Sequence, residues 1–361
     1  MRLGVEAALV EGRVLPGDVE VVDGSIAAVG LAPVTGRGLA VPGFVDLQVN
    51  GFGGVDFLAA DADAYARAGE ALLRTGVTAF QPTLITAPEE ELEAALGEVP
   101  AGSAAPHVLG AHLEGPFLAP ERLGAHPADS RRDPDAALLE RLLAAGPVAH
   151  VTLAPELPGA LELVDLLCAR GVTVACGHSN ATAEEARLGF DHGARTVTHI
   201  FNAMRPFEAR EPGLAGAALA CADVAVQVIL DGVHLADDTA RLVWRAAAGR
   251  MALVTDAVSG AGVGDGSYRL GSVDVEIENG VVRRADSVLA GSTVTMIDAV
   301  RNLVALGAPL AGALAAASEV PARVAGRSDV GSLRPGAAAD VLVLDDSLEI
   351  QRVLAAGEDA L

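Results

Sequence analysis

Short apolar runs alternate with longer amphipathic stretches through the central part of the chain. Apolar runs of this length, bounded by turn residues, predict buried β-strands, and the amphipathic stretches between them predict helices. Strands are expected at 43–49, 77–82, 108–114, 150–154, 172–176, 196–200, 225–230 and 251–255. Helices are expected at 64–75, 134–145, 160–170, 182–192 and 237–249, the last with Asp237 as a possible N-cap. Strand–helix alternation repeated eight times is typical of the α/β class, as a parallel TIM-like (β/α)8 barrel.

The two ends of the chain show a different pattern. Two short β runs within 19–30 flank an Asp-Gly pair, which is a hairpin signal, and another β run covers 339–344. Neither end carries a helical stretch long enough for a barrel crossover. We therefore expect a small β-sandwich domain built from 1–41 and 326–361, beside a catalytic barrel domain of residues 42–325.

A further β segment is expected near 266–285, after the eighth barrel strand. It carries Asn279-Gly280, a pair that favours a tight hairpin turn. A lid-like insertion and a decorated loop both fit this pattern, and the loop is the commoner outcome.

Composition and charge exclude several classes of partner. The chain has 361 residues, of which 51% are hydrophobic, so it can bury a sizeable core. A formal net charge of −23 argues against nucleic acid and anionic membranes, which need a basic surface, and an anionic substrate would need local cations. No run of 18 apolar residues and no signal-peptide pattern is present, so we expect a cytoplasmic protein without a membrane span. The three cysteines fit a reducing compartment: Cys168, Cys176 and Cys221.

Lysine is absent from the chain. All 25 basic residues are arginine. This excludes a Schiff-base lysine, the lysine of a phosphate-binding P-loop, and any metal ligand derived from lysine.

Three residues with metal-binding side chains follow predicted strands. Glu114, His178 and His199 lie at the ends of strands three, five and six. Catalytic groups of barrel enzymes sit at these ends, and three Glu and His ligands with one open position make a catalytic zinc-type site. A lone histidine, however, more often packs in the core or lies on the surface. At this point both interpretations remain open.

Four other residues near predicted strand ends carry candidate chemistry. Asp256, after strand eight, could take a proton from water and pass it to a leaving group, or could be an ordinary turn aspartate. Arg210 and His234, in the loops after strands six and seven, could bind a phosphate, although spacing alone favours a surface ion pair and a loop histidine. His126, in a proline-flanked loop after strand three, could face the same pocket.

Several motifs occur together along the chain. In order, they are PGFVDLQVNGFGG, HLEGPF, VTLAPE, GHSNAT, THIFNAM, REPGLAG, DGVH, VTDA and LAGS. This series resembles the N-acetylglucosamine-6-phosphate deacetylase family of the amidohydrolase superfamily. The resemblance runs from about residue 41 to 296 and includes terminal segments such as GSLRPGAAADVLVLD. Each motif alone is a weak signal, and together they are highly specific.

The resemblance implies a function and a set of site residues. The reaction would be metal-dependent hydrolysis of N-acetyl-D-glucosamine 6-phosphate to glucosamine 6-phosphate and acetate, in amino-sugar catabolism. It implies Glu114, His178 and His199 as metal ligands and Asp256 as the acid/base residue. The implied substrate contacts are Ala125, His126, Asn202, Ala203, Arg210, His234, Leu289, Ala290 and Gly291. Similar enzymes share the phosphate contact across a homodimer, so Arg210 would serve a neighbouring site.

The end of strand one departs from the wider superfamily. Many members carry His-x-His there, together with a carboxylated lysine that bridges two metals. Here the pair is Gln48 and Asn50, and amides are poor zinc ligands. We therefore expect one divalent metal per chain, zinc foremost, with iron, cobalt or manganese as alternatives. Gln48 is expected to hydrogen-bond the water on the metal.

Other hypotheses remain. The substrate could be the galactosamine 6-phosphate epimer, which the sequence does not distinguish. Another hydrolase of the superfamily, such as a cyclic amidase or a deaminase, is possible, but the missing lysine disfavours bridged two-metal sites. A non-catalytic scaffold would be expected to have lost ligand positions, and all of them are intact here.

Overall fold

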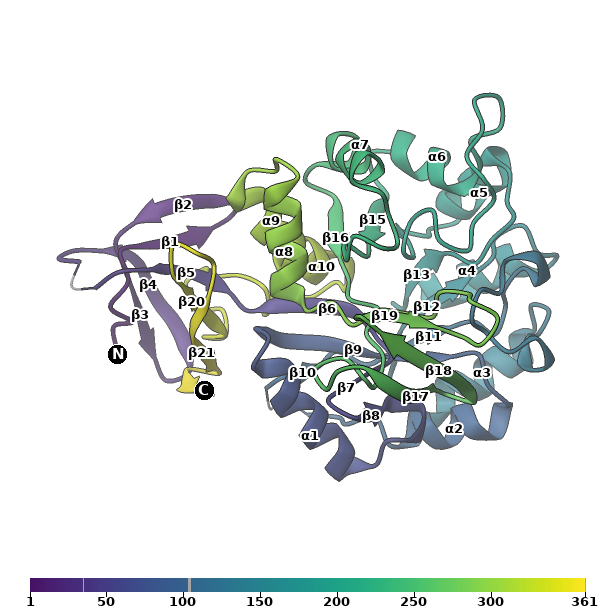
Figure 1. Ribbon diagram of the computed structural model, residues 1–361, viewed down its shortest axis with the longest axis horizontal. Helices are drawn as coiled ribbons and strands as arrows, with labels where there is room; N and C mark the ends of the chain where they lie inside the picture. Colours follow the sequence, from purple (N-terminus) through teal and green to yellow (C-terminus); the bar gives the residue numbers. More distant parts are fainter. Residues whose placement is uncertain (35, 103–104, 361) are drawn as a thin grey trace.

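The computed structural model describes residues 1–34, 36–102 and 105–360, and its centre is a barrel of parallel strands (Figure 1). In barrel order the strands are β6 (Phe44–Val49), β9 (Val77–Ile85), β11 (Ala111–Glu114), β12 (Val148–Leu153), β13 (Thr173–Cys176), β14 (Thr196–Val197), β15 (Ala225–Val228) and β16 (Met251–Leu253). A parallel bridge between Val49 and Ala257 brings the last strand back to the first. The predicted eight-stranded α/β barrel is confirmed.

Helices surround this barrel (Figure 1). They are α1 (Ala62–Leu73), α2 (Glu89–Gly97), α3 (Ala136–Ala145), α4 (Ala160–Ala169), α5 (Ala183–Asp191), α6 (Gly213–Ala220), α7 (Asp237–Ala247), α8 (Met296–Ala305), α9 (Leu310–Ala317) and α10 (Glu319–Val324). The N-cap prediction for α7 is wrong, because Ala236 takes the cap position and Asp237 is the first helical residue. Of the helices described, none is long and apolar enough to cross a bilayer.

The barrel strands are buried on both faces, as their near-continuous apolar runs indicate. All nine residues of β9 and all six of β6 are buried. The interior nevertheless contains a polar layer. The ring of His112 stacks on that of His150 with centroids 4.2 Å apart, and the hydroxyls of Thr152 and Thr198 lie 2.7 Å apart. Stacking between neighbouring strands and a hydrogen bond across the barrel interior, from β12 to the end of β14, therefore support the core together with apolar packing.

Both chain ends contribute to sheets that lie beside the barrel (Figure 1). One sheet has the order β2 (Arg13–Pro16), β1 (Ala7–Val10), β5 (Leu39–Pro42), β20 (Val341–Leu344), β21 (Ile350–Ala355) and β22 (Glu358–Asp359). The predicted hairpin is present as β3 (Asp18–Val22) and β4 (Ser25–Leu31), and its apolar side chains share one buried cluster with the six-stranded sheet. The division into domains 1–41 with 326–361 and 42–325 stays a prediction.

A three-stranded antiparallel sheet follows the eighth barrel strand. Its strands are β17 (Gly266–Leu270), β18 (Val273–Glu278) and β19 (Val281–Arg283). Three smaller strands lie elsewhere: β7 (Gly51–Phe52), β8 (Val55–Asp56) and β10 (His107–Val108). The β17–β19 sheet packs through a buried cluster that includes Leu270 and Ile277 against Ile85 and Ala125. It is therefore anchored to the end of the second barrel strand, at Ile85, and to the loop that follows the third, at Ala125.

His107 and Asp340 connect the barrel to the terminal sheets. Nε2 of His107, in β10, lies 2.8 Å from Oδ2 of Asp340, just before β20, and both residues are buried. The hydrogen bond with Asp340 raises the pKa of His107, against the lowering effect of burial. The stability from this pair is therefore fully present below the ordinary histidine pKa of about 6.5, and it is lost as pH rises through the raised pKa of the folded state.

The variant His107→Gln should lower the free energy of unfolding by about 1–3 kcal/mol near pH 6, because it leaves a buried carboxylate without its partner. The difference from the wild type should shrink near pH 9, where the imidazole is neutral. Urea unfolding at the two pH values measures both numbers. His192→Gln is the control, since the His192–Asp165 pair is much more exposed. A destabilisation that does not change with pH would contradict the ionic contribution.

Candidate active site

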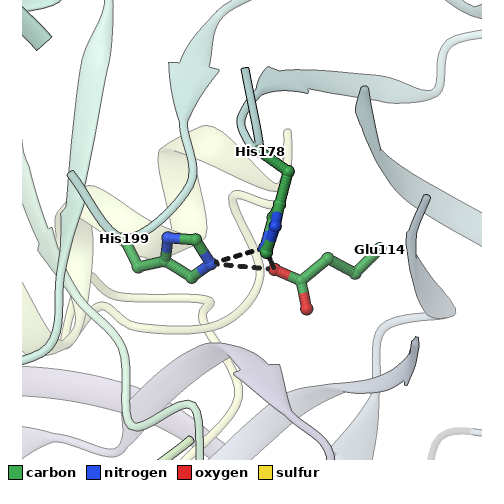
Figure 2. Close-up of side chains that lie close together, drawn as sticks. All are labelled: Glu114, His178 and His199. Carbon is green, nitrogen blue, oxygen red and sulfur yellow. Dashed lines mark hydrogen bonds and ion pairs between the residues drawn. The ribbon is translucent and has the colours of Figure 1, made fainter. Parts of the chain in front are cut away.

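Three side chains converge at the mouth of the barrel (Figure 2). Oε1 of Glu114 lies 3.2 Å from Nε2 of His178 and 3.0 Å from Nε2 of His199, and the two Nε2 atoms are 3.1 Å apart. All three residues are buried. The fold thus brings together three residues that were predicted at strand ends and that are up to 85 positions apart in the sequence.

The donor atoms of this group fit a metal ion. Nδ1 of His178 lies 2.9 Å from the carbonyl oxygen of Arg122, which only accepts, so Nδ1 carries the proton and Nε2 offers a lone pair. Burial alone would raise the pKa of Glu114, but the three histidines around its carboxylate hold it well below its ordinary range. One carboxylate oxygen and two imidazole nitrogens form a ligand set that catalytic zinc takes in proteins. Glu114, His178 and His199 could therefore hold a divalent metal.

The backbone at the strand ends adopts an uncommon conformation. His178, His199 and Asp256 each follow their strand by two or three residues, with φ angles of 48°, 26° and 50°. Positive φ costs a residue with a side chain about 1–3 kcal/mol, and such residues cluster at functional sites. Three of the four predicted reactive residues thus share this conformation.

Two amide side chains of β6 and its end orient the carboxylates. Nε2 of Gln48 donates to Oε1 of Glu114 at 2.9 Å, and Nδ2 of Asn50 donates to Oδ1 of Asp256 at 2.7 Å. Gln48 is fully buried, so what the structure shows is an amide that orients Glu114. The expected hydrogen bond from Gln48 to water on a metal stays a prediction.

Asp256 lies in the same cavity as the three possible ligands. Its carboxylate is buried, and burial together with the negative charge of Glu114 raises its pKa to about 6. Glu114 and Asp256 therefore have pKa values shifted in opposite directions, although both are buried carboxyl groups. Such a pair suits one carboxylate as a permanent anion and the other as a proton carrier.

His126 lies beside His178 and is held by Thr86. The backbone N–H of Thr86 points at Nδ1 of His126 at 3.3 Å, so this nitrogen is an acceptor and Nε2 carries the proton. Nε2 lies 3.4 Å from Oε2 of Glu114. Burial lowers the pKa of His126 to about 4. The ring is thus a neutral hydrogen-bond donor near the possible metal position.

A cavity of about 230 Å³ joins these groups. Most of the predicted substrate contacts line it: Ala125, His126, Asn202, Ala203, His234, Leu289 and Gly291. Three predicted residues do not. Ala290 is buried behind the wall, Gln48 lies beneath Glu114, and Arg210 is exposed on the loop that follows β14.

His234 is preorganised by a nearby carboxylate. Its Nδ1 lies 2.7 Å from Oδ2 of Asp231, and its backbone N–H donates to the other oxygen at 2.9 Å. Burial would raise the pKa of Asp231, but the hydrogen bonds from His234 hold it below its ordinary range. The two contacts with Asp231 therefore fix the orientation of the His234 ring at the edge of the cavity.

Sequence reasoning missed several cavity residues. Asn50 entered only as a replaced ligand, although its position two residues after Gln48 placed both on one face of a strand. Sequence reasoning also missed Thr86, which contacts His126, and the apolar cavity residues Ile85, Ile229 and Leu270. The apolar residues look like ordinary core positions in the sequence, so no local signal identifies them.

Comparisons with known proteins identify the family. The chain matches the Amidohydrolase family over residues 39–359. It is 41% identical over 343 residues to N-acetylglucosamine-6-phosphate deacetylase of Mus musculus, covering 90% of this chain and 83% of the mouse protein. It is 37% identical over 360 residues to N-acetylgalactosamine-6-phosphate deacetylase of Escherichia coli O157:H7, covering 96% of each. A Mycobacterium smegmatis N-acetyl-D-glucosamine-6-phosphate deacetylase variant in complex with N-acetyl-D-glucosamine-6-phosphate superposes with a TM-score of 0.93, at 39% identity and with 99% and 98% of the two chains covered.

The chain therefore belongs to the amidohydrolase family. Relatives that it matches over most of its length are named as deacetylases of 6-phosphorylated N-acetyl amino sugars. The resemblance seen in the sequence motifs is confirmed, and the intact site argues against a non-catalytic scaffold.

If His178 is a metal ligand, His178→Asn should weaken zinc binding by at least about 10²-fold, because one imidazole of the first coordination shell is lost. Isothermal titration of metal-free protein with zinc measures the affinity directly. His192→Asn is the matched control and should bind zinc as the wild type does. Equal zinc affinity in the wild type and His178→Asn would remove His178 from the ligand set.

Proposed function

We propose that the protein hydrolyses the N-acetyl group of N-acetyl-D-glucosamine 6-phosphate, giving glucosamine 6-phosphate and acetate. One observation carries the proposal. The buried Glu114–His178–His199 group and the carboxylate of Asp256 face one cavity, in a chain that is 41% identical to a deacetylase of this substrate. The same arrangement suits other amide substrates, so the proposed substrate rests on the relatives.

We propose one divalent metal per chain, zinc first, with iron, cobalt or manganese as alternatives. Such an ion lowers the pKa of water and polarises a carbonyl group. Glu114, His178 and His199 would hold it. Because the amide of Gln48 is turned toward Glu114 and no lysine is present, a second tight site is not expected.

Asp256 is the proton carrier in this mechanism. It accepts a proton from the attacking water and then delivers it to the departing amine nitrogen, without which the C–N bond would break slowly. The raised pKa of Asp256 suits both steps, since the group can be deprotonated and reprotonated near neutral pH. The hydrogen bond from Asn50 keeps one oxygen of the carboxylate fixed while the other is free to act.

His126 supports the acetyl oxygen. With Nδ1 accepting from Thr86, Nε2–H is available as a donor toward the carbonyl oxygen, on which negative charge develops in the transition state. A neutral donor suits this role because its proton stays in place through the reaction.

His234 and Arg210 would bind the sugar phosphate. His234 lines the cavity and is hydrogen-bonded to Asp231, whereas Arg210 is exposed outside the cavity. We therefore propose a homodimer in which Arg210 reaches the cavity of the neighbouring subunit. In a chain of net charge −23, the guanidinium of Arg210 would offset the repulsion that an anionic substrate meets.

A second candidate substrate is the galactosamine 6-phosphate epimer, because one relative at 37% identity carries that name. The two hypotheses predict opposite ratios of kcat/KM for the two N-acetyl hexosamine 6-phosphates. We further propose a cytoplasmic location, which the three free thiols of Cys168, Cys176 and Cys221 support.

Replacing Asp256 by Asn should lower kcat for acetate release by about 10²–10⁴, since the proton carrier is lost while shape and zinc affinity are kept. In the wild type, kcat/KM should fall as pH drops through about 6, the pKa of Asp256, because only the deprotonated form can accept a proton. Asp286→Asn, on the exposed surface, is the control. Near-normal turnover by Asp256→Asn would refute the acid/base role, and no acetate release by the wild type would refute the proposed function.

The variant Arg210→Ala should weaken binding of the phosphorylated substrate by about 1.5–3 kcal/mol, since one charge-assisted hydrogen bond is lost. KM should rise, with kcat nearly unchanged, and the exposed Arg67→Ala is the control. If Arg210 acts across a dimer, mixed subunits of Arg210→Ala and Asp256→Asn should regain activity, because one of the two sites is then complete. An unchanged KM for Arg210→Ala would exclude the phosphate contact.

A further inference from the structure

One corner of the cavity is apolar and lies directly beside Glu114. Ile85 closes β9 and is the register partner of Glu114 on the neighbouring strand. Leu270 closes β17 and Ala125 precedes His126, and both share a buried cluster with Ile85. These three side chains line the cavity and are at most 9% exposed. The mechanism described above uses neither Ile85 nor Leu270.

The proposed chemistry fixes which part of the substrate faces this corner. The reacting carbon of an amide carries an oxygen, a nitrogen and an acyl carbon. The nitrogen must lie toward Asp256, after the eighth strand, and the oxygen toward the donor of His126. The sugar and its phosphate then extend toward His234, after the seventh strand, and toward Asn202, after the sixth. The acyl carbon is then left facing the end of the second strand, where Ile85 lies.

We propose that Ile85 and Leu270 form the acyl pocket and restrict the substrate to a short, apolar acyl group such as acetyl. The proposal rests on the proposed deacetylase function and adds the residues that set acyl-chain length. It assigns a role to the β17–β19 sheet, which supplies Leu270 as one wall of the pocket.

The pocket has little room to expand. A β-carbon at Gly271 would lie 3.3 Å from Cδ1 and Cγ1 of Ile85, and 2.9 Å from Cδ2 of Leu58. The backbone of the β17–β18 turn therefore packs directly against Ile85, and Gly271 also has a φ of 57° that favours glycine. Ile85 cannot move back to admit a longer chain without displacing this turn. Close packing of this kind makes each additional methylene costly.

The test compares three substrates, namely the N-acetyl, N-propionyl and N-butyryl derivatives of glucosamine 6-phosphate. The kcat/KM for release of each carboxylate is measured for the wild type and for Ile85→Ala. One methylene in an apolar pocket changes kcat/KM by about 10–200-fold. The ratio of propionyl to acetyl kcat/KM should therefore rise at least about 10-fold in Ile85→Ala, and Leu270→Ala should raise it in the same direction.

Ile229→Ala is the matched control, because Ile229 lines the same cavity just after β15, on the side assigned to the sugar. The ratio should stay within about 3-fold of the wild type, since no space opens beside the acyl carbon. If Ile85→Ala does not fold, Ile85→Val should give a smaller rise of the same sign.

Two results would overturn the acyl pocket while leaving the function intact. One is an unchanged ratio in both Ile85 variants with acetyl activity retained, and the other is a shift in Ile229→Ala alone. A wild type that hydrolyses none of the three amides would overturn the proposed function, and the acyl pocket with it. The two failures are therefore distinguishable in one set of assays.

Discussion

The site depends on the seam where the first barrel strand meets the residues after the last. The hydroxyl of Thr255 donates to buried Asp46 at 2.6 Å, and the N–H of Asp256 donates to the carbonyl of Gln48 at 2.9 Å. The N–H of Asn50 in turn donates to Ala257 at 2.8 Å. These bonds hold Asp256 within reach of Asn50 and in the same cavity as Glu114. Without closure of the barrel, the proton carrier Asp256 would lie far in space from the possible metal ligands.

Burial gives the two carboxylates of the site opposite properties. Glu114 is surrounded by three imidazole rings and the amide of Gln48, which stabilise its charge despite desolvation. Asp256 has one amide donor, and burial together with the negative charge of Glu114 raises its pKa. A permanent anion suits a metal ligand, and an adjustable one suits proton transfer. The different partners, more than the residue type, therefore separate the two proposed roles.

The barrel and the central residues of the site could be predicted from sequence, whereas the boundaries and the second layer of contacts could not. Strand periodicity located each barrel strand, yet β14 ends at Val197 and not at residue 200, because His199 takes a positive φ. The third strand is broken at Gly110, with a φ of 93°, so β10 and β11 are separate. The contacts of Thr86 and Ile85 depend on packing between distant segments, which periodicity does not encode. The exposed position of Arg210, by contrast, agrees with the surface location that spacing alone favoured.

The proposed deacetylase site works with one metal ion and one proton carrier. Metal-free protein titrated with zinc, with acetate release from N-acetyl-D-glucosamine 6-phosphate measured at each addition, tests it most directly. The arrangement of Glu114, His178 and His199, with Gln48 turned toward Glu114, predicts activity that rises linearly and reaches its plateau at one zinc per chain. A plateau only at two zinc ions per chain, or full activity in the metal-free protein, would contradict the account.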